Sequence, residues 1–130
     1  MICKISEPKD MAKVYDYLSN VEETIMTNLA DFMMMCMKGR VYAVKRNNNI
    51  KGALCMYETK EYVFVAHMYV NKSLRHTKQT YELYKLICKY GRDKSKDVFT
   101  LMKDATKVKN LFIEVGKHDG MTKYQILLKD

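Results

Sequence analysis

The first forty residues combine one short alternating stretch with two stretches of helical periodicity. Residues 1–6 alternate weakly and predict a strand, after which Ser6 is placed to cap a helix that tolerates Pro8 in its first turn. In this helix the apolar residues recur every three or four positions: Met11, Val14, Tyr15 and Leu18. A second helix is predicted to end at Gly39 and to carry one apolar face, made of Ile25, Leu29, Phe32, Met33 and Cys36.

The centre of the chain changes to strand patterns. Residues 40–45 and 50–57 are β-prone and flank three asparagines, 47–49, which suit a tight turn because asparagine tolerates positive φ. These segments predict a β-hairpin. Residues 62–70 are apolar on both faces except at His67, which predicts a central strand with both faces covered.

The last third returns to helical spacing twice. We predict a helix over residues 76–90 with Gly91 as its terminator, a strand over 98–102, a helix over 105–115 that ends at Gly116, and a strand over 121–128. The order β-α-α-β-β-β-α-β-α-β predicts one α/β domain over residues 1–130, with a mixed central sheet flanked by helices.

Composition limits the classes of protein that fit this pattern. The chain has 130 residues, of which 48% are hydrophobic, so a packed core is expected rather than disorder. Neither a bilayer-spanning apolar run nor a hydrophobic signal core is found, so we expect a cytoplasmic protein without membrane contact. The four cysteines lack the spacing of metal ligands, which predicts reduced thiols and no metal site.

Positive charge is concentrated in the second half of the chain. The net charge is +8, with nine basic and eight acidic residues in positions 1–70 against 14 and seven in positions 71–130. Five basic residues form one stripe on the predicted helix and its exit: Lys78, Lys85, Lys89, Arg92 and Lys96. The stripe is compatible with a solvated helix face, with a docking surface for an acidic patch on another protein, or with contacts to phosphate groups.

One local pattern, together with the order of elements, resembles the GNAT acyltransferase superfamily over essentially the whole chain. In that family the central strand ends in a valine, and five residues later an arginine or glutamine opens the loop R/Q-x-x-G-x-G/A. Val70 and Arg75 match these positions, whereas Lys78 and Thr80 replace the two glycines. The resemblance implies that Val70, Arg75, Lys78 and Thr80 are the residues that would hold the pyrophosphate of coenzyme A.

A second family pattern is the late helix and its exit, N-x-x-A-I-x-L-Y-x-x-L-G-F. Aligned on Gly116, Phe112 takes the place of the tyrosine that in the family donates a proton to the departing thiolate, and phenylalanine has no donor. The same alignment leaves the family's penultimate strand nearly absent. His67 and Glu58 are the nearest candidates for a general base, but they are more typical of an interior histidine and a strand-end charge, so we assign no catalytic residue.

These departures favour a GNAT fold with degraded or absent catalysis, which acts without a cofactor as a structural, assembly or docking component. From Arg75 to Gly116 the chain resembles short GNAT-like proteins of tailed bacteriophages. That resemblance implies a place in the host cytoplasm or the virion, and partner proteins with acidic patches, virion subunits among them. The alternative is an active acetyl-CoA-dependent N-acyltransferase with an unorthodox pyrophosphate loop. A third hypothesis is a nucleic-acid-binding protein whose lysines contact phosphate groups. Such binding would be nonspecific, because the basic stripe lacks the arginine pairs and the row of aromatic side chains that recognise particular bases.

Overall fold

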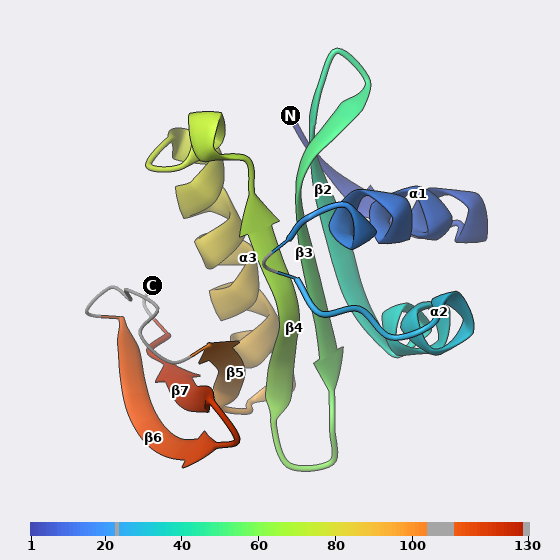
Figure 1. Ribbon diagram of the computed structural model, residues 1–130. Helices are drawn as coiled ribbons and strands as arrows, with labels where there is room; N and C mark the ends of the chain where they lie inside the picture. The colour runs from blue at the N-terminus through green and yellow to red at the C-terminus, as the bar shows by residue number, and fades with distance from the viewer. Residues whose placement is uncertain (23, 104–110, 129–130) are drawn as a thin grey trace.

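A twisted seven-stranded sheet forms the centre of the computed structural model, which describes residues 1–22, 24–103 and 111–128 (Figure 1). The strand order is β1-β2-β3-β4-β5-β7-β6, and neighbouring strands are antiparallel except for the parallel pair β4–β5. The strands are β1 (Ile2–Ile5), β2 (Gly39–Arg46), β3 (Asn49–Glu58), β4 (Val63–Val70), β5 (Val98–Lys103), β6 (Phe112–His118) and β7 (Met121–Ile126). The predicted mixed α/β domain is therefore confirmed.

The two faces of the sheet are covered by different helices. Helices α1 (Pro8–Ser19) and α2 (Leu29–Met37) lie on one face, and α3 (Lys78–Lys94) lies on the other (Figure 1). Two apolar cores result, one under α1 and α2 around Phe32 and one under α3 around Leu83. A short 3₁₀ turn, η1 (Lys72–Leu74), joins β4 to α3. No helix in the described part of the chain is long and apolar enough to cross a membrane.

Helix α1 has the predicted apolar stripe, since Met11, Val14 and Leu18 are buried. The predicted cap is wrong, however. The N-cap residue is Glu7, one position later than Ser6, and no side chain caps the helix there. Pro8 at the first helical position supplies the missing boundary signal, because its fixed φ suits a first turn and its absent N–H is not needed there.

Helix α2 begins later than predicted. It begins after Asn28, whose side chain accepts a hydrogen bond from the Asp31 amide at 2.9 Å, and Ile25 lies outside it with 72% of its surface exposed. The helix ends at Met37 with Lys38 as its C-cap residue, so Gly39 follows the cap as predicted and is also the first residue of β2. A Cβ atom at Gly39 would lie 1.8 Å from the Met56 carbonyl oxygen, so the glycine permits close approach of two strands.

The predicted hairpin is confirmed. Arg46 pairs with Asn49, and the two residues between them, Asn47 and Asn48, have φ of 53° and 65°. Asparagine adopts this left-handed conformation more readily than most residues, so it forms the two-residue turn that the β2–β3 connection needs.

Gly91 does not end α3, contrary to the prediction. The helix continues to Lys94 and ends where Ser95 adopts φ of 54°. Gly91 is buried inside the helix, and a Cβ atom there would lie 2.7 Å from Cγ2 of Val98 and 2.9 Å from Cδ1 of Leu128. The glycine therefore lets the helix pack closely on the sheet.

The predicted helix over residues 105–115 is wrong where the structure describes it. Phe112–His118 forms β6, an edge strand that pairs with β7, so the penultimate strand is present. Residues 104–110 lie outside the described part. The run Phe112-Ile113-Glu114-Val115 is rich in β-branched and aromatic residues, which favour strands. Its apolar spacing also fits a helix, but pairing with β7 stabilises the strand.

Candidate functional site

Strands β4 and β5 pair only at their beginnings and then diverge (Figure 1). The last pair joins Val65 to Thr100, although β4 continues to Val70 and β5 to Lys103. The divergence coincides with a β-bulge in β4, because Cys55 of β3 faces His67 while Met56 faces Val65, which leaves Ala66 without a partner. Beyond the bulge, the edge of β4 that faces β5 has no strand paired to it in the described residues.

A cavity of about 520 Å³ occupies this divergence. Its walls come from β4, the N-terminal half of α3, β5 and the start of β6, and the lining residues are Met68, His76, Thr77, Thr80, Tyr81, Tyr84, Ile87, Met102, Leu111 and Phe112. We call this cavity the cleft. Its apolar side chains come from the sheet, from Leu111 just before β6 and from Ile87, whereas hydroxyl and imidazole groups gather just before α3 and in its N-terminal half. The volume lies within the range typical of small-molecule sites, which is about 300–1,000 Å³.

The connection between β4 and α3 is held by Arg75. Its Nε donates a hydrogen bond of 2.9 Å to the Val70 carbonyl, and its guanidinium carbon lies 5.1 Å from the centre of the Tyr69 ring. This side chain therefore ties the loop to the end of β4. Arg75 and Val70, which were predicted from sequence as members of one site, do lie together.

The first turn of α3 lacks a side-chain cap. The hydroxyls of Thr77 and Thr80 both donate to the Leu74 carbonyl, at 2.5 and 3.1 Å, so the Thr77 hydroxyl does not accept a first-turn amide. The backbone amides of Lys78, Gln79 and Thr80 have no intrahelical acceptor, as in any first turn. They lie beside the cleft at the positive end of a 17-residue helix dipole, which favours an anion.

The two residues that replace the family's glycines are placed differently. The Lys78 side chain is 86% exposed, forms a 3.8 Å ion pair with Glu82, and does not line the cleft. Thr80 does line it, but its hydroxyl is directed to the Leu74 carbonyl. The structure therefore places Val70 and Arg75 together at the loop that joins β4 to α3, but of the four predicted residues only Thr80 lines the cleft, and Lys78 lies in solvent.

Neither of the residues considered as a general base lines the cleft. Glu58 forms ion pairs with Lys96 at 2.8 Å and with Lys94 at 3.7 Å, and the hydrogen bond from Lys96 lowers the pKa of its carboxyl group. His67 lies on the α2 side of the sheet, where its ring centre is 6.1 Å from that of Phe32, and burial lowers its pKa. Glu58 therefore forms ion pairs at the end of β3, and His67 is an interior histidine.

Phe112 does not lie on a helix, so its alignment with the family's tyrosine is wrong. It projects into the cleft from β6 and contacts the Tyr124 ring, with 6.3 Å between the ring centres. Sequence reasoning missed His76, Tyr81 and Tyr84 as cleft residues. The signal that identifies the two tyrosines is their i, i+3 spacing directly after the matched loop. The Tyr84 hydroxyl donates to the Leu127 carbonyl, which fixes the ring between α3 and the end of β7.

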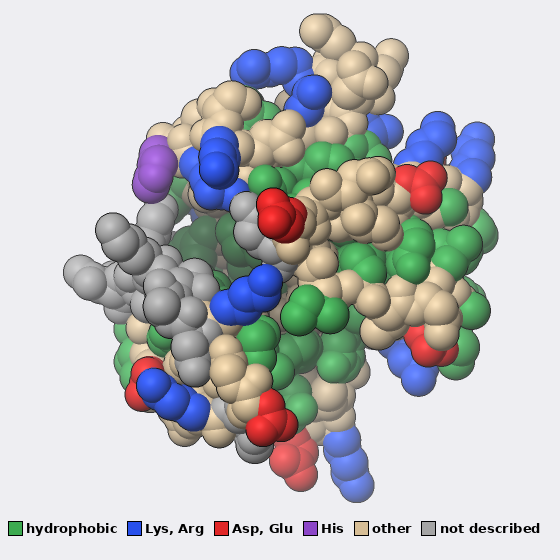
Figure 2. All heavy atoms as spheres, viewed as in Figure 1, with side chains coloured by type: hydrophobic (Ala, Val, Ile, Leu, Met, Phe, Trp, Pro, Cys, Tyr) green, Lys and Arg blue, Asp and Glu red, His purple; other side chains and the backbone are tan. Residues whose placement is uncertain are grey.

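The predicted basic stripe is partly neutralised. Lys89 forms an ion pair of 3.3 Å with Asp93, Lys78 pairs with Glu82, and Lys96 pairs with Glu58. The Lys85 ammonium lies 5.0 Å from the centre of the Tyr81 ring. In the view of Figure 2, Lys and Arg side chains are scattered among acidic, apolar and uncharged ones. A docking role for Lys78, Lys85, Lys89, Arg92 and Lys96 stays a prediction.

Comparisons with known proteins identify the fold. No protein-family model and no curated protein sequence matches the chain. Among solved structures, Ard1 from Thermoplasma volcanium matches 99% of this chain and 98% of its own, with a TM-score of 0.71 and 16% identity. A NatB acetyltransferase complex bound to CoA and MES matches 99% of both chains, with a TM-score of 0.75 and 12% identity.

A third match is a GNAT family acetyltransferase from Elizabethkingia anophelis with acetyl-CoA bound, which covers 98% of this chain and 97% of its own. Its TM-score is 0.64 and its identity 15%. These matches span the whole chain, and they offer no support for a role in particle assembly. Together with the divergence of β4 from β5 and the loop before α3, they show that the chain has the GNAT fold.

Proposed function

We propose that the protein binds acetyl-CoA in the cleft and transfers the acetyl group to an amine. The observation that carries this proposal is the divergence of β4 from β5 at the Ala66 bulge, which opens a cavity of about 520 Å³ that ends at the first turn of α3. Two acetyltransferases with the same fold, one with acetyl-CoA bound and one bound to CoA, support it. This is the alternative of the sequence analysis, and it replaces the reading without a cofactor.

The unpaired edge of β4 is suited to an extended ligand with amide groups. Residues 66–70 retain strand geometry, and among the described residues no strand pairs with them on the β5 side, so their backbone groups offer the hydrogen bonds that a further strand would take. The pantetheine arm of coenzyme A carries two amides along an extended chain. It would lie along this edge, with Met68 and Met102 providing apolar contact.

The pyrophosphate would lie at the first turn of α3. Three backbone amides and the helix dipole meet it there, and Arg75 holds the loop in place through the Val70 carbonyl. Because the Thr80 hydroxyl is turned toward Leu74, the replacement of glycine by threonine leaves the helix terminus open. Lys78 adds positive charge at longer range from solvent.

The reaction requires little covalent chemistry from the protein. With acetyl-CoA bound, a neutral amine would attack the thioester carbonyl carbon, so that a carbon–nitrogen bond forms and the carbon–sulfur bond breaks. The nitrogen would give up one proton and the departing thiolate would take one up, which leaves an amide and free coenzyme A. Positioning of the two reactants and hydrogen bonds from β4 amides to the developing oxyanion are the contributions that this cleft can make.

A single substitution at the helix terminus tests the proposal. Thr80→Glu places a carboxylate where the pyrophosphate is proposed to lie, and the like charges repel the ligand from the first-turn amides. Loss of one charge-assisted hydrogen bond between such an amide and the pyrophosphate, about 1.5–3 kcal/mol, corresponds to a roughly 10- to 100-fold weaker affinity. Asn48→Asp makes the same charge change on the β2–β3 turn, outside the cleft, and its acetyl-CoA affinity should equal that of the original protein. Isothermal titration calorimetry measures both. Equal affinities for the two variants would contradict the proposed site.

A further inference from the structure

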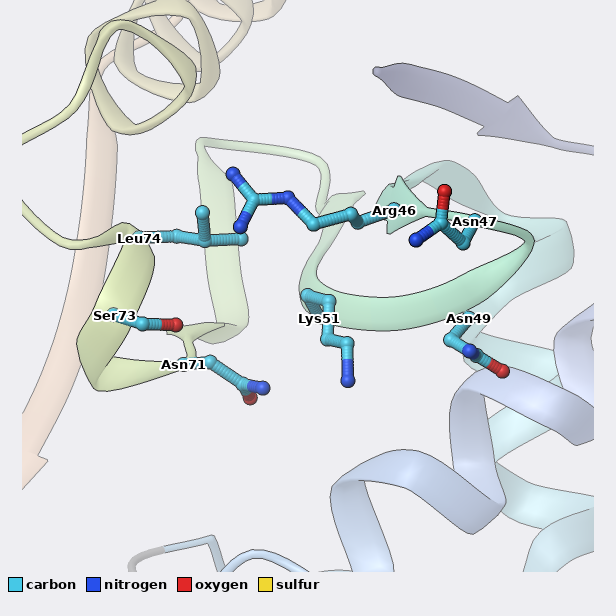
Figure 3. Close-up of a pocket in the computed structure, with 7 residues that line it drawn as sticks. All are labelled: Arg46, Asn47, Asn49, Lys51, Asn71, Ser73 and Leu74. Carbon is cyan, nitrogen blue, oxygen red and sulfur yellow. The ribbon is translucent and has the colours of Figure 1, made fainter.

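A separate pocket lies between the β2–β3 hairpin and η1 (Figure 3). Its volume is about 340 Å³, and it shares no lining residue with the cleft. We call it the hairpin pocket. Its walls carry two cations, three carboxamides, one hydroxyl and one apolar side chain, and the lining residues are Arg46, Asn47, Asn49, Lys51, Asn71, Ser73 and Leu74.

A β-bulge places Lys51 in this pocket. Val44 faces Gly52 and Lys45 faces Ile50, so Lys51 is the extra residue of β3 and has no partner on β2. Gly52 lets β3 and β4 lie close together next to the bulge, because a Cβ atom at this position would lie only 3.0 Å from the Tyr69 carbonyl oxygen. The carbonyl of Lys51 accepts a hydrogen bond of 2.8 Å from the Asn71 amide, which fixes the bulge to the end of β4.

The two cations of the pocket have no acidic partner within the described ranges. No ion pair found there involves Arg46 or Lys51, and no Asp or Glu lines the pocket. Figure 3 shows Arg46 reaching from the hairpin toward Leu74, while Lys51 extends between Asn71 and Asn49. Two uncompensated positive charges therefore face one polar cavity, which favours an anionic ligand.

The orientation of Asn71 supports the same ligand class. The Tyr17 hydroxyl donates to Asn71 Oδ1 at 2.5 Å, so the amide hydrogens on Nδ2 are what Asn71 offers to the pocket. Burial raises the pKa of Tyr17 to about 12, so the phenol keeps its proton and remains the donor at physiological pH. Asn71 therefore presents donors, as an anion requires.

We propose that the hairpin pocket binds the phosphate group of a small molecule other than coenzyme A, held by Arg46, Lys51 and Asn71. Guanidinium offers a planar fork of donors that matches phosphate oxygens, and lysine adds a compact charge. The volume lies near the lower end of the range for small-molecule sites and exceeds that of a lone phosphate, so the ligand carries further polar groups that the remaining carboxamides and Ser73 meet.

Inorganic pyrophosphate is the probe for the test. Titration followed by amide NMR should give saturable shifts at Asn47, Lys51 and Asn71. Arg46→Gln should weaken this binding by about 10-fold or more, as expected for loss of a charge-assisted hydrogen bond. Arg46 is exposed, so the variant is expected to fold, and its dispersed NMR spectrum checks this. Lys60→Gln removes one charge at the β3–β4 turn and should leave the affinity unchanged. Absence of saturable shifts, or equal weakening by Arg46→Gln and Lys60→Gln, would overturn the proposal.

Two further arms separate this pocket from the coenzyme site. Thr80→Glu should leave the pyrophosphate shifts at the hairpin pocket unchanged, and Arg46→Gln should leave acetyl-CoA affinity unchanged. If Thr80→Glu abolishes those shifts, or if Arg46→Gln weakens acetyl-CoA binding about 10-fold, the pocket serves the phosphates of coenzyme A and the proposal is wrong. The pyrophosphate titration needs no acetyl-CoA, so its result does not depend on whether the proposed function holds.

Discussion

The Thr100 hydroxyl donates a hydrogen bond of 2.9 Å to the Val65 carbonyl at the last residue pair that β4 and β5 share. Beyond this pair the strands separate, and Thr100 keeps only 6% of its surface exposed. The hydroxyl thus satisfies a carbonyl at the point where the sheet opens, and it marks the inner end of the proposed acetyl-CoA site.

Thr100→Val should destabilise the protein, because it leaves the Val65 carbonyl without this donor in a buried place. An unsatisfied buried group costs about 1–3 kcal/mol in free energy of unfolding, which urea denaturation measures. Thr100→Ser keeps the hydroxyl and should lose less stability than the valine variant. A valine variant as stable as the original protein would show that the hydrogen bond has no net effect.

Gly91→Ala should destabilise α3 although alanine has the higher helix propensity. The new Cβ atom would lie 2.7 Å from Cγ2 of Val98, and overpacking of this kind costs about 1–3 kcal/mol, against about 1 kcal/mol gained in propensity. Gly116→Ala is the control, since a Cβ atom there meets nothing within 4 Å. Thermal unfolding should show a lower midpoint for Gly91→Ala alone. Equal midpoints for the two variants would refute the packing role of Gly91.

Stability should fall as the pH drops below about 6.5, the ordinary pKa of histidine. Burial lowers the pKa of His67 in the folded state, so the unfolded chain binds the proton first and is favoured at lower pH. The effect is absent above the unfolded pKa and grows as the pH falls toward the folded one. In His67→Leu this contribution is removed, so the urea midpoint should change less between pH 7.5 and pH 5.5. An unchanged pH dependence in the variant would contradict the assignment.

Arg75→Lys should weaken acetyl-CoA binding even though the charge is kept. Lysine has neither the Nε donor to the Val70 carbonyl nor the planar group that lies over Tyr69. Loss of a hydrogen bond of about 0.5–1.5 kcal/mol predicts a roughly 2- to 10-fold higher Kd by calorimetry. Arg46→Lys makes the same replacement outside the cleft and should have no effect on acetyl-CoA. If both variants bind like the original protein, Arg75 does not position the loop.

The elements with strong local signals were predictable from the sequence. The hairpin followed from asparagines that tolerate positive φ, and the central place of β4 followed from its two apolar faces. The strand at residues 112–118 was missed because the apolar spacing around it also fits a helix, and only pairing with β7 decides between them. Periodicity alone carries no information on such non-local contacts.

The site was predictable only in part, for the same physical reason. The spacing of Val70 and Arg75 located the loop, and the structure joins them by a hydrogen bond. The bulge at Ala66 has no composition signal, so the opening between β4 and β5 could not be foreseen. The ion pair between Lys96 of the basic stripe and Glu58 could not be foreseen, because the two residues are distant in sequence.

Amide NMR during titration with acetyl-CoA tests the central claim most directly. Binding in the cleft predicts saturable shifts along residues 66–70 of β4 and at residues 78–80 of α3, two segments that the cleft brings to one ligand. The Thr80→Glu variant should lose these shifts at the same ligand concentrations, whereas Asn48→Asp should keep them. No shift, or shifts confined to exposed lysines such as Lys85 and Lys89, would contradict an acetyl-CoA site between β4 and β5.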